Sequence, residues 1–463
     1  MFSGALTAVL LVRTAALRAV PPLELLPVSI GINEDRAVAR LAGAIQVGIS
    51  DTNESPSALA MRPGSEGAGA LRDYLEGAFP AIASALSWDE VGGGSLLLSW
   101  QGKEPGLPPI LLASPADGSS GIYVTVGATV GPLVAILEAV DGLLSEGFQP
   151  KRTILLAFVG GGSHSGDAGA AELADYLAKE GIRPVWALVE GSDVKVGTMP
   201  GLSDPFALIG TAERGSATLR VSASREGGGA AGAPSSNAIA RVARAIAHLD
   251  EDPFPARVRG PTRELFLTLG PYLDPGTRML VSNLWLLEGP VARALAQRPG
   301  LEPAVRTTLV PVRFSTEGGD AELGAASTEL SVGIAPWDTP DTVLARAWGV
   351  VSDLGVEVVF PSNRPAPIPP SRVSSSQSEG FELIQRAVFR TFPDVIAAPP
   401  GVVEAPTPGR YYDDVAEDVF RFVPLRAEAG TGVGTRGTTE RVRVPAFLDM
   451  IRFYAGLIRE AAG

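Results

Sequence analysis

The stretch that decides the fold runs from Ile154 to Leu177 and reads ILLAFVGGGSHSGDAGAAELADYL. An apolar, β-branched run leads into three glycines and a short polar segment, and a sequence with helical spacing follows. Such a run is typical of a strand that is buried on both faces of a parallel sheet. A loop after such a strand is where α/β proteins place ligands and catalytic groups, so residues 160–166 form the first candidate site.

The same alternation extends outward in both directions from this stretch. Strands are expected in GSLLLSWQG, PPILLASPAD and RPVWALVEG, and helices in NEDRAVARLAGAIQV and YVTVGATVGPLVAILEAVDGLLSEG. Alternating strands and helices favour a mostly parallel sheet with helices on both faces. The predicted fold class is therefore α/β.

The pattern changes after Phe206. FALIGTAERGSATLRVSASRE and STELSVGIAPW alternate like exposed strands, while SNAIARVARAIAHLD and DTVLARAWGVVSDLG have helical spacing. This mixture predicts an inserted α+β unit that interrupts the larger one. The expected division is an apolar leader or remnant anchor (1–21), the first part of the large domain (22–206), the inserted lid or dimerisation domain (207–360), a Pro/Ser linker (361–378) and the second part of the large domain (379–463).

Composition excludes several kinds of site. The 463 residues carry 38 basic and 51 acidic side chains, a net charge of −13, which argues against a nucleic-acid partner. The chain has no cysteine, so disulfides, thiolate metal sites and a cysteine nucleophile are excluded. It has two histidines, His164 and His248, and the second is expected on the polar side of a helix, in contact with solvent.

The amino terminus, MFSGALTAVLLVR, begins with an apolar run of about 12 residues, shorter than the roughly 20 that span a bilayer. Its positive charges, Arg13 and Arg18, follow the run, whereas a signal peptide carries them before it. Residues 1–20 are therefore expected to form an amphipathic leader or the remnant of a signal-anchor, with membrane contact through them. Localisation stays open between a cytoplasmic protein and one anchored or exported through this segment.

Several stretches, in this order, resemble one enzyme family: LAGAIQV, ILLASPAD, ALIGTAERGSATLRV, LVSNLWLLEGPVARAL with AVRTT, FRFVPL, and the closing helix. From about Ile32 to its end, the chain resembles the zinc metallopeptidases related to carboxypeptidase S, aminoacylase and carboxypeptidase G, and above all the carboxypeptidase S-like N-acyl-amino-acid hydrolases and synthases. The resemblance implies the phosphorylase/hydrolase-like zinc peptidase fold. It also implies two zinc ions that are bridged by a carboxylate and a water, which lower the pKa of that water.

The family's metal motifs fall on residues that do not suit zinc. The strand-end motif histidine-any-aspartate falls on SPAD, which puts Pro115, a residue without a ligand atom, at the histidine position and Asp117 at the position that orients it. The bridging aspartate falls on Thr129, a neutral hydroxyl. The family's paired glutamates, general base and ligand, fall on Gly162 and Ser163.

The remaining family positions are altered as well. The aspartate ligand of the next strand falls on Glu190, and the last histidine falls on Arg436, a fixed cation that repels zinc. In the lid, the histidine that steadies the oxyanion falls on Gly229 and the arginine falls on Gly333. A two-zinc site of this kind needs two histidine ligands and a lid histidine, so the chain's histidine count also implies that no zinc cofactor is bound.

Three functions remain open. The first is an inactive homologue, a pseudoenzyme whose former cleft, with Arg436 and Gly229, binds the carboxylate of a peptide or an N-acyl-amino acid. The second is a hydrolase of peptides or N-acyl amino acids with one metal ion, for which His164, Asp117 and Glu190 are the candidate ligands. The third is an interaction protein that pairs through the inserted domain with a second copy or with an active paralogue.

Overall fold

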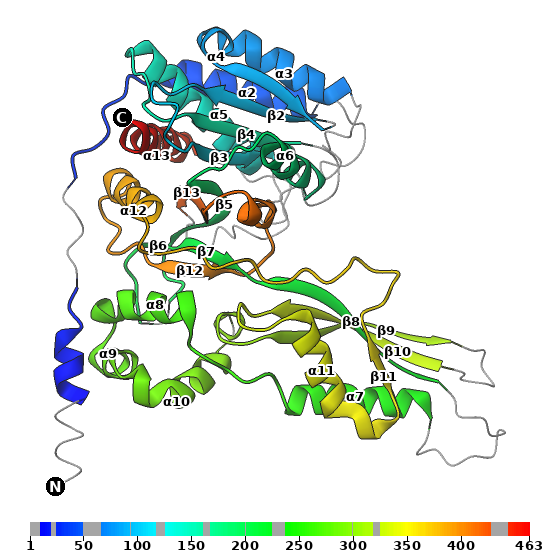
Figure 1. Cartoon of the computed structure of the whole chain (residues 1–463). Coiled ribbons are helices and arrows are strands. Elements are labelled where there is room, and N and C mark those ends of the chain that lie inside the picture. The colour runs from blue at the N-terminus through cyan, green and yellow to red at the C-terminus, as the bar shows by residue number, and fades with distance from the viewer. Residues whose placement is uncertain are drawn as a thin grey trace.

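Figure 1 shows the computed structural model of the chain, in which a large α/β unit lies above an elongated arm. The structure describes residues 10–19, 25–49, 66–92, 94–116, 126–160, 167–199, 201–224, 237–298, 300–317, 325–426 and 443–463. The large unit contains a nine-stranded sheet in the order β1-β2-β4-β3-β5-β13-β7-β12, with β6 paired to β5. Its strands are β1 (Ser87–Val91), β2 (Ser95–Trp100), β3 (Ile110–Pro115), β4 (Ile154–Val159), β5 (Trp186–Lys195), β6 (Phe206–Ala207), β7 (Ile209–Glu213), β12 (Pro400–Val403) and β13 (Asp418–Arg426).

The centre of this sheet is parallel. Strands β4, β3, β5 and β13 pair in parallel, whereas β1, β2 and β6 add to it antiparallel. All six residues of β3 and of β4 are buried, as expected for apolar strands that are covered on both faces. Together with the flanking helices, this arrangement confirms the predicted α/β fold class.

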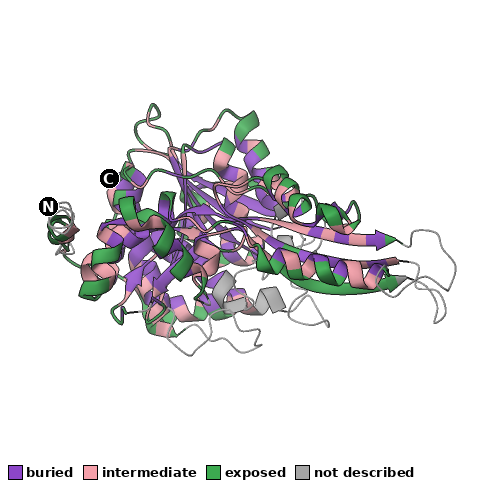
Figure 2. Ribbon diagram, turned by 90° about the horizontal axis from the view of Figure 1, so that it is seen from below, coloured by how far each residue is buried: buried purple, intermediate pink, exposed green. Residues whose placement is uncertain are grey.

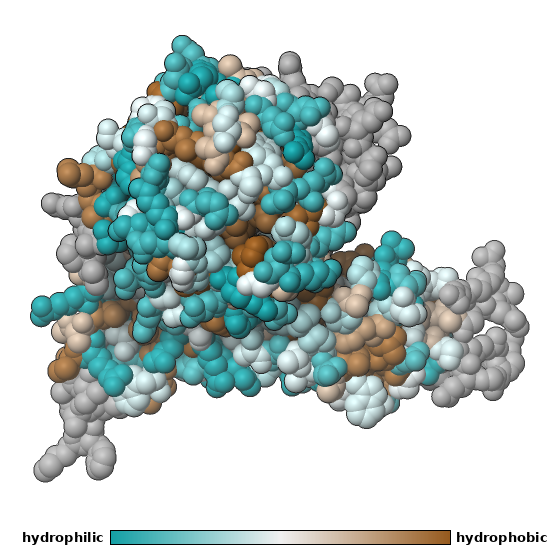
Figure 3. Space-filling view, turned by 45° about the horizontal axis from the view of Figure 1, so that its top comes forward, coloured by the Kyte–Doolittle hydropathy of each residue, from teal (hydrophilic) through white to brown (hydrophobic). Residues whose placement is uncertain are grey.

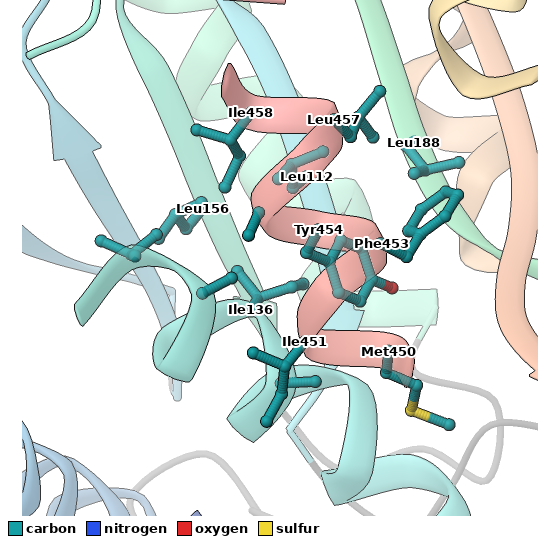
Figure 4. Close-up of a cluster of buried hydrophobic side chains, with 14 of the residues drawn as sticks. Leu112, Ile136, Leu156, Leu188, Met450, Ile451, Phe453, Tyr454, Leu457 and Ile458 are labelled. Carbon is teal, nitrogen blue, oxygen red and sulfur yellow. The ribbon is translucent and has the colours of Figure 1, made fainter. Parts of the chain in front are cut away.

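Helices cover both faces of the large sheet (Figures 1 and 2). The larger apolar core takes side chains from α2 (Glu34–Ile49), α4 (Pro80–Ala85), α5 (Val126–Ser145), α12 (Glu379–Thr391) and α13 (Val444–Ala462). It also takes side chains from α3 (Glu66–Ala78). The opposite face is covered by α6 (Asp167–Lys179) and the 3-10 helix η6 (Pro408–Asp414). Helix α13 contributes its buried side chains to the middle of the larger core, beside the central strands (Figure 4).

The arm contains a four-stranded antiparallel sheet in the order β11-β8-β10-β9. Its strands are β8 (Gly215–Ser224), β9 (Thr308–Glu317), β10 (Ala325–Ile334) and β11 (Glu357–Val359). Helices α7 (Ala238–Glu251) and α11 (Pro340–Val351) pack on one face and bury a small apolar core against it. On the other face, Glu329 pairs with Arg220 and Arg364 at 2.9 and 2.5 Å, and these hydrogen bonds lower the pKa of Glu329 to about 2.

A group of helices joins the arm to the large unit. Helices α8 (Gly260–Leu269), α9 (Pro275–Ser282) and α10 (Leu284–Ala296) share an apolar core with Phe206 of β6 and Ala397, which precedes β12. Short 3-10 helices, η3 (Gly270–Tyr272), η4 (Glu302–Ala304) and η5 (Ser352–Leu354), complete the connections. A helix formed by residues 10–16, called the leader helix below, lies beside α9 (Figure 1). None of the helices among the described residues is long and apolar enough to span a membrane.

The chain enters and leaves the arm side by side. It enters at Gly215 directly after β7, and Ser216 exchanges two backbone hydrogen bonds with Ile368, at 2.9 and 2.8 Å. Farther along, the backbone nitrogens of Ser371 and Ser374 donate to the carbonyl oxygens of Glu213 and Thr211. The Pro/Ser segment that the sequence suggests as a linker therefore runs back along the entering strand.

Candidate functional site

The carboxyl ends of β3, β4 and β5 meet at one edge of the large sheet. Pro115 at the end of β3 lies opposite Val159 at the end of β4, and the Ala116 nitrogen donates to the Val159 oxygen at 2.7 Å. From this edge the chain passes to α5, whose fourth residue is Thr129, and to α6. Strand β5 carries Glu190 beside them. The sheet topology therefore gathers three of the predicted site residues, Pro115, Thr129 and Glu190, around one edge.

The other predicted site residues lie outside the described residues. They are Asp117, Gly162, Ser163, His164, Gly229 and Arg436. Their assignment to the site stays a prediction from the sequence.

Glu190 is a buried carboxylate at the centre of this edge. It is 6 % exposed, and the Ser114 hydroxyl of the neighbouring β3 donates to its Oε1 at 3.3 Å. Tyr454 of α13 is buried close by. Burial and, secondarily, the negative charge of Glu190 raise the pKa of Tyr454, so its hydroxyl stays protonated. Glu190 is thus placed among hydroxyl groups, next to a proline that offers no ligand atom.

The adjacent part of the sheet holds a buried ion pair that sequence reasoning missed. Arg421 of β13 is fully buried, and its Nε lies 2.9 Å from Oε2 of Glu213, which is 1 % exposed. Thr407 donates both its backbone N–H and its hydroxyl to the same carboxylate oxygen, at 2.9 and 2.5 Å. A second acid, Asp413, lies 3.5 Å from the guanidinium; burial raises its pKa, and Arg421 opposes that shift.

This ion pair touches the candidate edge directly. A Cβ on Gly191, next to Glu190, would lie 2.4 Å from the Cβ of Arg421, so β5 and β13 approach this closely only because residue 191 is a glycine. The signal in the sequence was the single cation inside the apolar run VFRFVPL. Such a residue is costly to bury without a partner, and the sequence does not indicate which carboxylate pairs with it.

Gly333 of β10 lies against a second buried arginine. Arg214, 3 % exposed at the junction of β7 and β8, donates to the carbonyl oxygen of Gly333, to that of Arg306 and to the hydroxyl of Thr308. A Cβ on Gly333 would lie 2.7 Å from Nη2 of Arg214. The guanidinium thus fills the space that a side chain at position 333 would need. Burial lowers the pKa of Arg214 to about 10.

The described part of the site does not fit a pair of zinc ions. Within the described ranges, no group of three or more His, Asp or Glu side chains could hold a metal ion. Asp193 of β5 forms an ion pair with Lys195, whose ammonium group lies 2.8 Å from the Asp193 carboxylate. His248 is half-buried in α7 of the arm rather than fully solvated.

The chain is similar in sequence to several named proteins. The chain is 30% identical over 413 residues to "Probable carboxypeptidase S-like 2" of Dictyostelium discoideum, covering 84% of this chain and 78% of that protein. It is 27% identical over 447 residues to the mouse "N-fatty-acyl-amino acid synthase/hydrolase PM20D1", covering 91% and 87%. No protein-family profile matches the chain.

Solved structures give the same fold. The M20 family metallo-carboxypeptidase Sso-CP2 of Sulfolobus solfataricus superposes with a TM-score of 0.55 at 14% identity, over 91% of this chain and 98% of that one. Human carnosine dipeptidase 1 superposes with a TM-score of 0.54 at 12% identity, over 93% and 99%. At such low identity these structures bear on the fold alone.

Proposed function

Because the chain belongs to the carboxypeptidase S and aminoacylase family of metallopeptidases, we propose that it is a pseudoenzyme, a member that keeps the fold without the metal site. The observation that carries this proposal is Pro115, which lies buried at the strand end where the resemblance puts the family's histidine ligand and has no atom that could bind zinc. The chain's two histidines are fewer than the site requires. Glu190, a carboxylate at the same edge, accepts a hydrogen bond from Ser114.

The test is metal content and hydrolysis measured on the same full-length protein. After incubation with zinc and dialysis, we expect less than about a tenth of an equivalent of zinc, manganese or iron per chain, because the chain lacks the histidine ligands. An intact structural or catalytic site would keep its metal through dialysis. Hydrolysis of N-fatty-acyl amino acids and of dipeptides should equal the rate without protein. The mouse relative, treated identically, is the positive control.

Two results would contradict this expectation. Near-stoichiometric metal together with hydrolysis would mean that the protein is an active hydrolase. If that metal were lost in Glu190→Gln and in His164→Ala, the one-metal alternative with Asp117, His164 and Glu190 would hold instead. A Glu288→Gln variant, changed at a half-buried acid of α10 far along the chain, controls for nonspecific loss of binding.

A ligand of such a pseudoenzyme would resemble chemically the substrates of its active relatives. The names of the relatives point to peptides or N-acyl amino acids, all of which carry a carboxylate. Arg436 and Gly229 stay the predicted binding residues, since a guanidinium pairs well with a carboxylate.

The arm supports a second candidate function, pairing with a second copy or with an active paralogue. Strand β9 is an edge strand of ten residues, and Val310, Val312 and Phe314 on it are 54, 61 and 46 % exposed. An exposed apolar edge strand is a surface for association between chains. Pro311 lacks an N–H group, so apolar contacts rather than a full backbone ladder would carry the pairing.

Light scattering across micromolar concentrations checks this second candidate. We expect the mass of a dimer, and the mass of a monomer for the double variant Val312→Lys, Phe314→Lys, because two charges would be buried in the interface. Trp348→Lys, on the arm's helix α11, is the matched control and should leave the mass unchanged. A monomer at every concentration, alone and with a paralogue, would exclude pairing at β9.

A further inference from the structure

The leader helix is docked on the junction between α9 and α10 by one of its faces. Thr14 exchanges a 3.0 Å hydrogen bond with Ser282, and Asn283, fully buried between the two helices, donates to the Leu10 carbonyl oxygen at 3.3 Å. Arg278 donates to the carbonyl oxygen of Leu17. Residues 10, 14 and 17 share one side of the helix, so this side is the docked face.

The opposite face of the leader helix is apolar and open to solvent. Leu11 and Val12 are 58 and 67 % exposed, and Ala15 and Ala16 beside them are exposed as well. An amphipathic helix that lay only on the protein would turn polar residues outward. The leader helix therefore has an apolar face that the described residues leave uncovered.

The helices beneath it continue this apolar surface. Met279 and Leu280 at the end of α9 are 36 and 40 % exposed, and Trp285 and Leu286 at the start of α10 are 50 and 46 % exposed. Among the described residues, twelve large apolar side chains are exposed, and six of them belong to the leader helix and this junction. Figure 3 shows apolar residues at the lower left of the molecule. Such a concentration marks an interaction surface.

Local charge distinguishes this corner from the rest of the protein. The chain as a whole has a net charge of −13, yet exposed Arg13 and Arg18 and half-buried Arg278 lie on or beside the leader helix. The Arg13 guanidinium lies 5.2 Å from the centre of the Trp285 ring. These helices also carry two acids: Asp274 caps the first turn of α9, and Glu288 of α10 accepts a hydrogen bond from the Val258 nitrogen. Tryptophan with flanking arginines is typical of a membrane–water interface.

We propose that the leader helix and the α9–α10 junction form one membrane-contacting surface, which lies in the headgroup region of a bilayer that contains anionic lipid. The sequence that precedes Leu10, MFSGALTAV, is apolar, so it lengthens the apolar run that leads to this surface. A run of about 12 apolar residues is too short to span a bilayer but long enough to enter its interface. Arginines beside an anionic leaflet add to the apolar contribution.

Vesicle binding of the full chain tests the proposal. We expect flotation with vesicles of phosphatidylcholine and phosphatidylglycerol, weaker flotation with phosphatidylcholine alone, and quenching of tryptophan fluorescence by brominated lipid. Leu280→Ser with Leu286→Ser should weaken binding about tenfold or more, because burial of a leucine side chain is worth at least one factor of ten. Leu11→Ser with Val12→Ser should do the same.

A matched pair of tryptophans makes the test specific. Trp285→Ser should remove much of the lipid quenching, whereas Trp348→Ser, at the similarly exposed tryptophan of α11, should leave binding unchanged. The proposal fails if the wild type does not float, if only the leader variant loses binding, or if both tryptophan variants behave alike. It also fails if the surface drives self-association without lipid, since a second copy would then be its occupant.

Discussion

Replacement of Arg421 by methionine should lower the free energy of unfolding by about 3–5 kcal/mol, the range found when one partner of a buried ion pair is removed. Glu213 would stay 1 % exposed, with two hydrogen bonds from Thr407 and with Arg410 at 4.0 Å, but without the guanidinium that binds it directly. A buried carboxylate that loses its closest cation is strongly disfavoured. Because Arg421 joins β13 to β7 in the sheet, the loss should lower the stability of the large unit as a whole.

Arg426→Met is the control on the same strand. Its ion pair with Asp394 is half-exposed, at 35 and 54 % for the two side chains, so its loss should cost no more than about 1 kcal/mol. The double variant Glu213→Gln, Arg421→Met should recover part of the stability, since the Glu213 charge is removed together with its cation, while Asp413 still loses its contact with Arg421. Urea unfolding followed by circular dichroism measures all three; equal losses for the two arginine variants would show that burial of the pair is unimportant.

Phe453→Ala should destabilise the protein by about 3–5 kcal/mol, as large-to-small changes of buried aromatic residues do. Phe453 is fully buried on α13, and its ring lies 5.6 Å from that of Phe422 in β13 and 5.4 Å from that of Tyr454. Leu188 of β5 lies near the same ring (Figure 4). Truncation would leave a cavity between helix and sheet that these neighbours, themselves tightly packed, can fill only in part.

Trp348→Ala is the control, since an aromatic side chain is likewise truncated, at a position that is 57 % exposed on α11. Its effect on unfolding should stay within about 0.5 kcal/mol, as is usual for surface positions. The midpoints of thermal unfolding of the two variants measure the same difference in stability without denaturant. A loss of less than 1 kcal/mol in Phe453→Ala would mean that α13 is not a main support of the central strands.

The central strands could be predicted because their sequences carry their own evidence. ILLAFV is apolar throughout, so only a strand buried on both faces suits it, and the structure places it as β4. The helix of the arm with Ile239, Val242 and Leu249 on one side was equally plain and forms α7. In both cases the local pattern of apolar residues determines which faces of the segment must be buried.

Pairings between distant residues could not be predicted in this way, because no local pattern indicates them. Glu213 and Arg421 are separated by 208 residues, and nothing local to either names the other. The same holds for Arg214, whose guanidinium occupies the space beside Gly333, 119 residues away. The stretch LVSNLWLLEGPVARAL was recognised as a family resemblance, but its exposed Trp285 and Leu286 lie beside the leader helix only in the assembled fold. Such features depend on the assembled fold, which a sequence pattern of short period does not contain.

The paired entry and exit of the arm have a consequence for how the chain can be rearranged. Since Ser216 and Ile368 already lie side by side, the intervening residues form a closed excursion from the large sheet. A short turn could join β7 to the segment at Ser371 without moving either, which is the condition for exchanging or removing an inserted unit. The arm can in this sense vary as a module, provided that α8–α10, which lie in the same excursion and pack against Phe206 and Ala397, are kept to cover that core.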